Sequence, residues 1–102
     1  MTKADLVEIV AERSGFTKTD VHVICDMLLD VIKEVMSEGH NIEIRRFGTF
    51  KLKIRRPRMA RNPKTGEPVP ITERVVPVFK PSNEFKNMIS ITPDELKDLG
   101  KF

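Results

Sequence analysis

Six basic side chains lie within twelve residues near the middle of the chain, namely Lys53, Arg55, Arg56, Arg58, Arg61 and Lys64. Ammonium and guanidinium groups at this density neutralise phosphates and release the counterions of a polyanion. A solvated charged surface would explain the basic residues, but the same stretch carries the turn signals Asn62-Pro63 and Thr65-Gly66 between strand-like flanks. The pattern therefore predicts a two-stranded basic arm, with a proline at its tip, that binds a polyanion.

The charge of the whole chain is also unevenly distributed. The net charge is only +3, but residues 1–44 carry 4 Lys/Arg and 9 Asp/Glu, whereas residues 45–90 carry 12 Lys/Arg and 3 Asp/Glu. Residues 91–102 carry 2 lysines and 3 acidic residues. A strongly basic half of a small protein indicates a polyanionic partner, most often nucleic acid.

Other residues with chemical potential are few and isolated. His22 and His40 have no cysteine or acidic cluster near them at metal-ligand spacing. The chain has no glycine-rich phosphate loop, no nucleophile elbow and no pair of carboxylates arranged for catalysis. The sequence therefore predicts no enzyme activity, no catalytic residue, no metal site, no cofactor and no small-molecule substrate.

The sequence also bears on the compartment. Cys25 is the only cysteine, so no internal disulfide can form, and its apolar helical context predicts a core residue. The chain starts without the apolar segment of a signal peptide, and no apolar run is long enough to span a membrane. These features predict a cytoplasmic protein with no membrane partner.

Two helices are predicted before the basic stretch. The first covers residues 3–14, with Thr2 as its N-cap, Asp5 as the capping-box partner and Gly15 at its end. The second begins after Thr17 and runs to about residue 38. Its apolar positions form more than one stripe, so we expect it to pack against a sheet and against another subunit. These positions are Val21, Ile24, Cys25, Leu28, Leu29, Val31, Ile32, Val35 and Met36.

The sequence then alternates as strands do. Residues 41–45 predict a short strand, and Gly48 marks a bend or a close backbone approach. In the next strand, one face is charged or polar and carries Thr49, Lys51, Lys53 and Arg55. The other face is apolar and carries Phe50, Leu52 and Ile54. Phe47, Phe50 and Phe79 fit either a base-stacking platform or a core, and their inward-facing spacing favours the core.

Beyond the arm, the alternation changes phase at Val75-Val76, which predicts a β-bulge that curves the ribbon. A third helix is predicted to start near Ser82. The tail has its own start signal, Thr92 followed by Pro93 and Glu95, which favours one further turn of helix.

Three segments together resemble the HU/IHF family of bacterial histone-like DNA-binding proteins. They are Arg46–Phe50, Ala60–Glu67, and Phe79–Pro81 with Phe85-Lys86. The resemblance covers residues 1 to about 90. It implies an α+β fold with an N-terminal helical hairpin, a three-stranded antiparallel sheet extended into a long two-stranded β-ribbon arm, and a C-terminal helix. It also implies an intertwined dimer, a DNA-binding domain over 1–90 with its arm at about 53–75, and a C-terminal extension over 91–102.

HU and IHF are known minor-groove architectural proteins, so the resemblance also implies residue roles. Pro63 would wedge between base pairs and kink the duplex, although the local sequence alone fits an ordinary turn proline. Beside it, the groove would be lined by Arg58, Arg61, Asn62 and Lys64. Phosphates would be contacted by Lys3, Lys53, Arg55, Lys80 and Lys86. The set of predicted DNA-binding residues is completed by Arg46, Arg56 and Arg74.

The sequence departs from the family pattern at the base of the arm. Arg46 stands where a glycine is usual, and it would either tighten DNA binding or reach an acid across the dimer. Ser82-Asn83 replaces the usual Gly-Lys, which removes one basic contact at position 83.

Three functions fit the sequence. The first is a weakly specific protein of the nucleoid that bends and compacts duplex DNA. The second is a site-specific bending factor of the IHF type that reads DNA deformability. The third is a structural RNA-binding protein, which ranks last because A-form grooves suit a wedge poorly. The partner is double-stranded DNA in the first two, and we expect a homodimer, with a heterodimer with a paralogue as the alternative.

Overall fold

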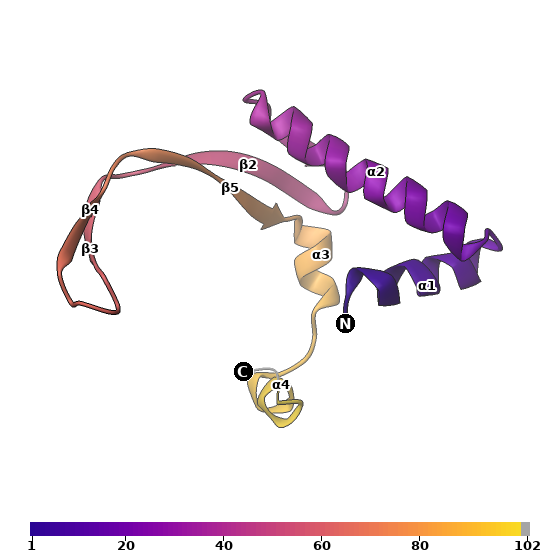
Figure 1. Cartoon of the computed structure of the whole chain (residues 1–102). Helices are drawn as coiled ribbons and strands as arrows, with labels where there is room; N and C mark the ends of the chain where they lie inside the picture. The colour runs from indigo at the N-terminus through magenta and orange to yellow at the C-terminus, as the bar shows by residue number, and fades with distance from the viewer. Residues whose placement is uncertain (101–102) are drawn as a thin grey trace. The chain divides into compact units, whose positions relative to one another are not determined.

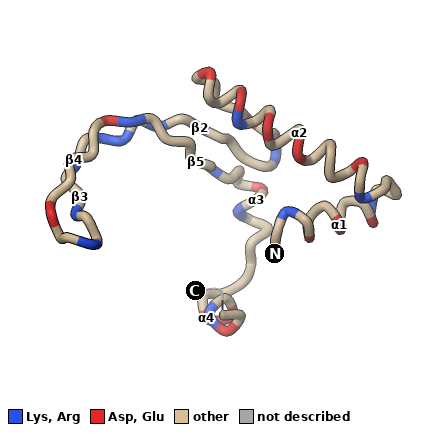
Figure 2. Tube along the Cα trace, viewed as in Figure 1, with Lys and Arg blue, Asp and Glu red and all other residues tan. Residues whose placement is uncertain are grey.

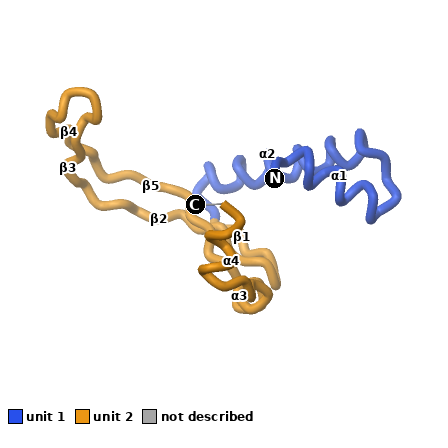
Figure 3. The backbone as a smooth tube through the Cα atoms, turned by 90° about the horizontal axis from the view of Figure 1, so that it is seen from below, with its two compact units in different colours: residues 1–40 blue, residues 41–102 orange. Residues whose placement is uncertain are grey.

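The computed structural model describes residues 1–100 and consists of two compact units (Figure 3). The first covers residues 1–40 and contains two helices, α1 (Lys3–Ser14) and α2 (Lys18–Ser37). The second starts at residue 41 and contains the strands and two short helices. No helix in the described part of the chain is long and apolar enough to cross a membrane.

The caps of the first two helices are those predicted. The Thr2 backbone N–H donates to the Asp5 carboxylate at 2.8 Å, and the Asp5 N–H donates to the Thr2 hydroxyl at 3.4 Å, which completes a capping box. Gly15 ends α1 at φ 78°. The hydroxyl of Thr17 accepts a hydrogen bond from the Asp20 N–H at 3.2 Å and caps α2. These are local interactions, which explains why the sequence alone located both helices.

The core of the helical unit is small. Val7, Ala11 and Val21 are buried together, and Cys25 packs against them as predicted. Large apolar side chains of α2 remain exposed in the single chain, and they include Val23, Ile24, Met27, Leu28, Leu29 and Val31. So many exposed apolar side chains on one helix mark an interaction surface, which fits the predicted packing of α2 against another subunit.

The second unit is built on an antiparallel sheet with strand order β1-β2-β5, of which β2 and β5 are labelled in Figure 1. These strands are β1 (Ile42–Ile44), β2 (Gly48–Arg55) and β5 (Arg74–Pro81). Two further strands, β3 (Arg58–Arg61) and β4 (Pro68–Ile71), pair antiparallel and carry the arm to its tip. The predicted three-stranded sheet extended into a two-stranded ribbon is confirmed.

The predicted bulge at Val75-Val76 is wrong. The two valines face Ile54 and Lys53 in an uninterrupted register that runs from Gly48↔Pro81 to Arg55↔Arg74. Neighbouring residues of a strand point to opposite faces, so one valine joins the apolar face and the other joins the charged face. The change of phase in the sequence therefore reflects a strand with apolar residues on both faces.

Four phenylalanines form a cluster of contacting rings in the sheet unit. The ring of Phe79 lies 4.8 Å from that of Phe50 and 5.2 Å from that of Phe47, between centroids. Phe85 joins them, with its centroid 5.3 Å from that of Phe47. The rings contact one another, but Phe47 and Phe79 are still 43% and 39% exposed in the single chain, so the core interpretation stays a prediction.

Gly48 lies against this cluster, and a Cβ built on it would come within 2.6 Å of the Lys80 carbonyl oxygen. The predicted close backbone approach is confirmed, because only glycine fits this space.

Two short helices follow the sheet, α3 (Asn83–Met88) and α4 (Pro93–Asp98). The Ser82 hydroxyl accepts from the Phe85 N–H at 3.1 Å and caps α3. The Thr92 hydroxyl accepts from the Glu95 N–H at 3.2 Å and caps α4. Both predicted helix starts are confirmed.

Candidate nucleic-acid interface

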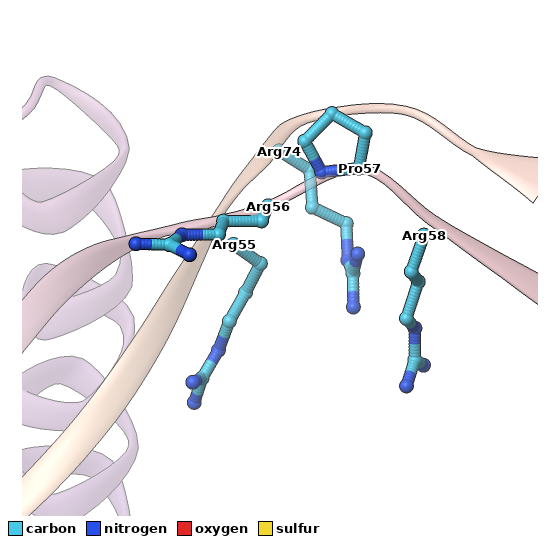
Figure 4. Close-up of a pocket in the computed structure, with 5 residues that line it drawn as sticks. All are labelled: Arg55, Arg56, Pro57, Arg58 and Arg74. Atoms are coloured by element: carbon cyan, nitrogen blue, oxygen red, sulfur yellow. The ribbon is translucent and has the colours of Figure 1, made fainter.

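The basic residues of the arm gather where the ribbon is interrupted. The ladder of β2 and β5 ends at Arg55↔Arg74, and that of β3 and β4 begins at Arg58↔Ile71. Around this interruption a hollow is lined by Arg55, Arg56, Pro57, Arg58 and Arg74. In Figure 4 the side chains of Arg55, Arg58 and Arg74 extend to the same side of the ribbon, whereas Arg56 points along it.

None of these four arginines forms an ion pair within residues 1–100, where the paired cations are Lys3, Lys18, His22, Lys33 and Arg46. The arm carries few acidic residues, Glu67 and Glu73, and its basic residues are the blue segments of Figure 2. Guanidinium groups without internal partners remain free to bind phosphate, often in bidentate geometry. Three of the predicted residues thus converge on one side at this point.

The tip is a four-residue loop held by its own hydrogen bonds. The Asn62 N–H donates to the Glu67 carbonyl at 2.9 Å, and the Gly66 N–H donates to the Asn62 carbonyl at 2.7 Å. The Asn62 side-chain oxygen accepts from the Lys64 N–H at 2.9 Å. Gly66 has φ 72°, which suits glycine. Pro63 is exposed in this loop and is used by none of these bonds.

The charged face of the sheet continues towards the base of the arm. Lys53 faces Val76 and Lys80 faces Thr49 across the β2–β5 ladder. A hollow at the base is lined by several basic side chains, which include Arg45, Arg46, Lys51 and Lys80. Arg45 and Lys51 were not among the predicted binding residues. The alternation of Lys51 with Lys53 and Arg55 was the signal that would have identified Lys51.

Arg46 occupies a strained position in the turn between β1 and β2. Its φ is 68°, in the left-handed region, and the Phe47 N–H closes the turn on the Ile44 carbonyl at 3.0 Å. A positive φ at the third residue of a turn favours glycine, which explains why glycine is usual here in the family. The Arg46 Nε lies 3.8 Å from a Glu84 carboxylate oxygen, so the acid that it reaches is in the same chain.

Replacing Arg46 by glycine is expected to increase the free energy of unfolding by about 1 kcal/mol. Glycine removes the steric cost of a left-handed residue, about 1–2 kcal/mol, and loses part of the gain to backbone entropy. Urea unfolding at fixed protein concentration measures the change. Arg45→Gly is the control, since Arg45 has no positive φ, and it should not stabilise. Equal effects of both variants would show that the backbone of Arg46 is unstrained.

Lys3 and Lys86 lie outside the arm. Lys86 is in α3. Lys3 belongs to the helical unit, where its ammonium group donates a hydrogen bond to the Asp26 carboxylate and joins the start of α1 to α2. The His22 Nε2 lies 3.0 Å from the other oxygen of Asp26. The hydrogen bond from Lys3 lowers the pKa of Asp26 below its ordinary value of 3.8, against a smaller opposing effect of desolvation and with the help of the neighbouring charges of His22 and Lys33.

Asp26→Asn is expected to lower the stability at neutral pH, by an amount that shrinks as the pH is lowered below about 3.8. Because the pKa of Asp26 is lowered in the folded protein, its contribution is complete above about pH 3.8 and is lost as the pH falls through the folded value. Urea unfolding of the wild type and the variant at pH 7 and at pH 2.5 measures how far the difference in stability shrinks. Asp30→Asn is the matched control, because Asp30 pairs with Lys33 on the same helix. A stability difference that does not shrink between pH 7 and pH 2.5 would exclude the ionic origin.

Within residues 1–100 there is no group of three His, Cys, Asp or Glu side chains that could hold a metal ion.

Comparison with known proteins agrees with this arrangement. Residues 1–90 match the family model described as bacterial DNA-binding protein. The chain is 43% identical over 100 residues to integration host factor subunit beta of Xanthomonas oryzae, which covers 96% of this chain and 97% of that protein. It is 41% identical over 92 residues to integration host factor subunit alpha of an Anaeromyxobacter species, which covers 90% of this chain and 93% of that protein.

Solved structures of the same fold include the HU protein of Anabaena in a cocrystal with DNA. It superposes with a TM-score of 0.82 at 33% identity and covers 90% of this chain and 100% of that one. An HU mutant from Thermotoga maritima superposes with a TM-score of 0.64 at 32% identity and covers 86% and 97% of the two chains. The α+β fold and the family resemblance are confirmed, and the chain belongs to the HU/IHF family of bacterial DNA-binding proteins.

Proposed function

We propose that the protein binds duplex DNA through the minor groove with two paired arms, and bends and compacts it with little sequence specificity. Membership of a family of architectural DNA-binding proteins supports the general role. The observation that carries the proposal is the set of arm arginines without ion-pair partners in the described chain, on a ribbon that ends in an exposed Pro63. Such a ribbon offers phosphate contacts along its length and an apolar wedge at its tip.

The proposal assigns each predicted residue a role. Pro63 enters a base step, and the groove beside it is lined by Arg61, Asn62 and Lys64. Arg58, which the resemblance places in that groove, lines the hollow with Arg55 and Arg74 and contacts phosphate with them. The phosphates are contacted from the arm, its base and the body by Lys3, Arg46, Lys53, Arg55, Arg56, Arg74, Lys80 and Lys86. Arg46 and Lys3 also have acidic partners in the same chain, Glu84 and Asp26, so their contribution is smaller than that of the arm arginines.

Two arms require two chains, and the exposed apolar face of α2 supplies a reason for them to associate. The proposal is a homodimer whose DNA-binding domain covers 1–90, with the arm at 53–75 and the extension 91–102 outside it. A heterodimer with a paralogue is the alternative, because similar proteins carry the names of alpha and beta subunits. In the cell the protein would act on the nucleoid in the cytoplasm.

Site-specific bending is the second candidate function. It is favoured by the names of similar proteins, because the chain is 43% and 41% identical to integration host factor subunits beta and alpha. In that case the energy needed to deform each sequence selects the site, without contacts to base edges.

Gel shifts with the purified protein test the function. We expect the protein alone to bind linear duplex DNA, and to prefer nicked or pre-bent duplexes, because bending them costs less. Footprints over random sequences separate the two candidates, since even protection indicates weak specificity and a discrete protected site indicates the second function. Duplex RNA should compete poorly. Equal competition by RNA would overturn the proposal in favour of a structural RNA-binding role.

A further inference from the structure

The arm has one strand register but two hydrogen-bonding phases. The register is the same on both sides of the interruption. Arg55 faces Arg74 before it and Arg58 faces Ile71 after it, with two residues between these pairs on each strand. No residue is therefore inserted in either strand. In an antiparallel ladder, hydrogen-bonded and non-hydrogen-bonded pairs alternate, and each kind lies on one face.

Two backbone bonds fix the phase at the two ends. The Ser82 N–H donates to the Phe47 carbonyl at 2.9 Å, so bonded pairs recur at every second residue through β2, as far as Arg55↔Arg74. The Asn62 N–H donates to the Glu67 carbonyl at 2.9 Å, so bonded pairs recur backwards from the tip to Arg58↔Ile71. Along β2 the hydrogen-bonded pairs are those of odd-numbered residues, whereas along β3 they are those of even-numbered residues. The phase must switch between residues 55 and 58.

Three prolines sit where the first phase cannot continue. An unswitched ladder would require backbone N–H groups from residue 57 to residue 72, from residue 70 to residue 59, and from residue 68 to residue 61. These donors would be Pro57, Pro70 and Pro68, and proline has no N–H. After the switch, Pro68↔Arg61 and Pro70↔Met59 are non-bonded pairs, in which no N–H is needed.

The switch decides where Arg58 points. In a continuous strand, residues three apart lie on opposite faces, so Arg55 and Arg58 would diverge. In the structure, Arg58 extends to the same side as Arg55 and Arg74 and lines the same hollow (Figure 4).

We propose that Pro57, Pro68 and Pro70 are positioning residues: they impose the phase switch that turns Arg58 to the side of Arg55 and Arg74 and so creates one phosphate-binding cluster at the middle of the arm. The DNA-binding part of this inference rests on the proposed function, whereas the switch itself does not. The binding chemistry belongs to the arginines, and the prolines act through backbone hydrogen bonding.

Cross-strand contacts measured by NMR test the switch without DNA. Facing Cα atoms are about 4.5 Å apart in non-bonded pairs and about 5.5 Å apart in bonded ones, so strong Hα–Hα contacts mark the non-bonded pairs. In the wild type we expect them at Met59↔Pro70 and Arg61↔Pro68. Strong contacts at 58↔71 and 60↔69 instead would overturn the switch, whatever the behaviour of any variant.

The variant that tests the prolines carries Pro57→Thr, Pro68→Thr and Pro70→Thr together. Threonine restores the three N–H donors and suits a strand, so the Hα–Hα contacts are expected to move to 58↔71 and 60↔69. The control is Pro77→Thr. Pro77 faces Leu52 in a non-bonded pair, because the Leu52 N–H points away from β5 and donates to the Asn41 side chain at 3.0 Å. The N–H of a threonine at position 77 would therefore point away from β2, to the open edge of the sheet. Unmoved contacts in the triple variant would show that the prolines do not impose the switch.

DNA binding then tests the consequence for Arg58. On the wild-type background, Arg58→Gln should reduce the slope of log K against log salt by about 0.9 for each arm bound. On the triple-threonine background the same change should reduce it by much less, because Arg58 has turned away. An equal reduction on both backgrounds would exclude the positioning role. If neither protein binds DNA, the proposed function fails, while the NMR result on the switch still stands.

Discussion

The Pro63→Ala protein is expected to bind duplex DNA with nearly the affinity of the wild type and to bend it much less. Unstacking a base step costs a few kcal/mol, and a rigid apolar ring without an N–H enters the step without leaving an unpaired donor. The loop itself should survive the change, because its hydrogen bonds join Asn62, Lys64, Gly66 and Glu67 and make no use of residue 63. End-to-end FRET on a short duplex measures the bend, and we expect less than about a tenfold change in Kd, or about 1.4 kcal/mol.

Pro77→Ala is the matched control for this experiment. It is the same chemical change on an exposed proline of β5, far along the ribbon from the tip loop. It should leave both the bend and the affinity unchanged. If Pro63→Ala bends DNA as far as the wild type does, Pro63 is a turn-forming residue only, and the wedge must be withdrawn.

The affinity for duplex DNA is expected to fall about 10³-fold between 50 and 200 mM salt. This is a minimum, because Arg55, Arg58 and Arg74 of two arms would alone neutralise about six phosphates, and each contact releases condensed counterions and contributes about −0.9 to the slope of log K against log salt. Gel shifts or fluorescence anisotropy over a salt series measure the slope. A variant with Arg55→Gln, Arg58→Gln and Arg74→Gln should show a slope smaller in magnitude by about 2.7 for each arm bound.

Lys18→Gln controls for the loss of positive charge as such. Lys18 lies in the helical unit, where its ammonium group is 3.3 Å from the Glu8 carboxylate, and it is outside the proposed interface. Its removal should leave the salt slope unchanged. An affinity that does not change with salt in the wild type would contradict the entire electrostatic basis of the proposed interface.

Much of the secondary structure was predictable because its determinants are local. The capping box of Thr2 with Asp5, the caps at Thr17, Ser82 and Thr92, and the close approach at Gly48 all depend on residues near in sequence or on glycine itself. The bulge predicted at Val75-Val76 was wrong, because the alternation along one strand does not show how that strand pairs with its neighbour. Ile54 and Lys53 stand opposite the two valines without any extra residue.

Some features of the candidate site were likewise predictable from the sequence, whereas others depend on the tertiary structure. The sequence by itself determined that a basic arm exists, that a proline lies in its tip loop and that acidic residues are concentrated elsewhere, because composition and turn chemistry depend on residue type alone. The tertiary structure decided which charges are free and where they point. It pairs Lys3 with Asp26 and Arg46 with Glu84, and it brings Arg58 beside Arg55 and Arg74. Those outcomes depend on contacts between residues distant in the chain and on hydrogen bonding between strands, which no single segment of the sequence specifies.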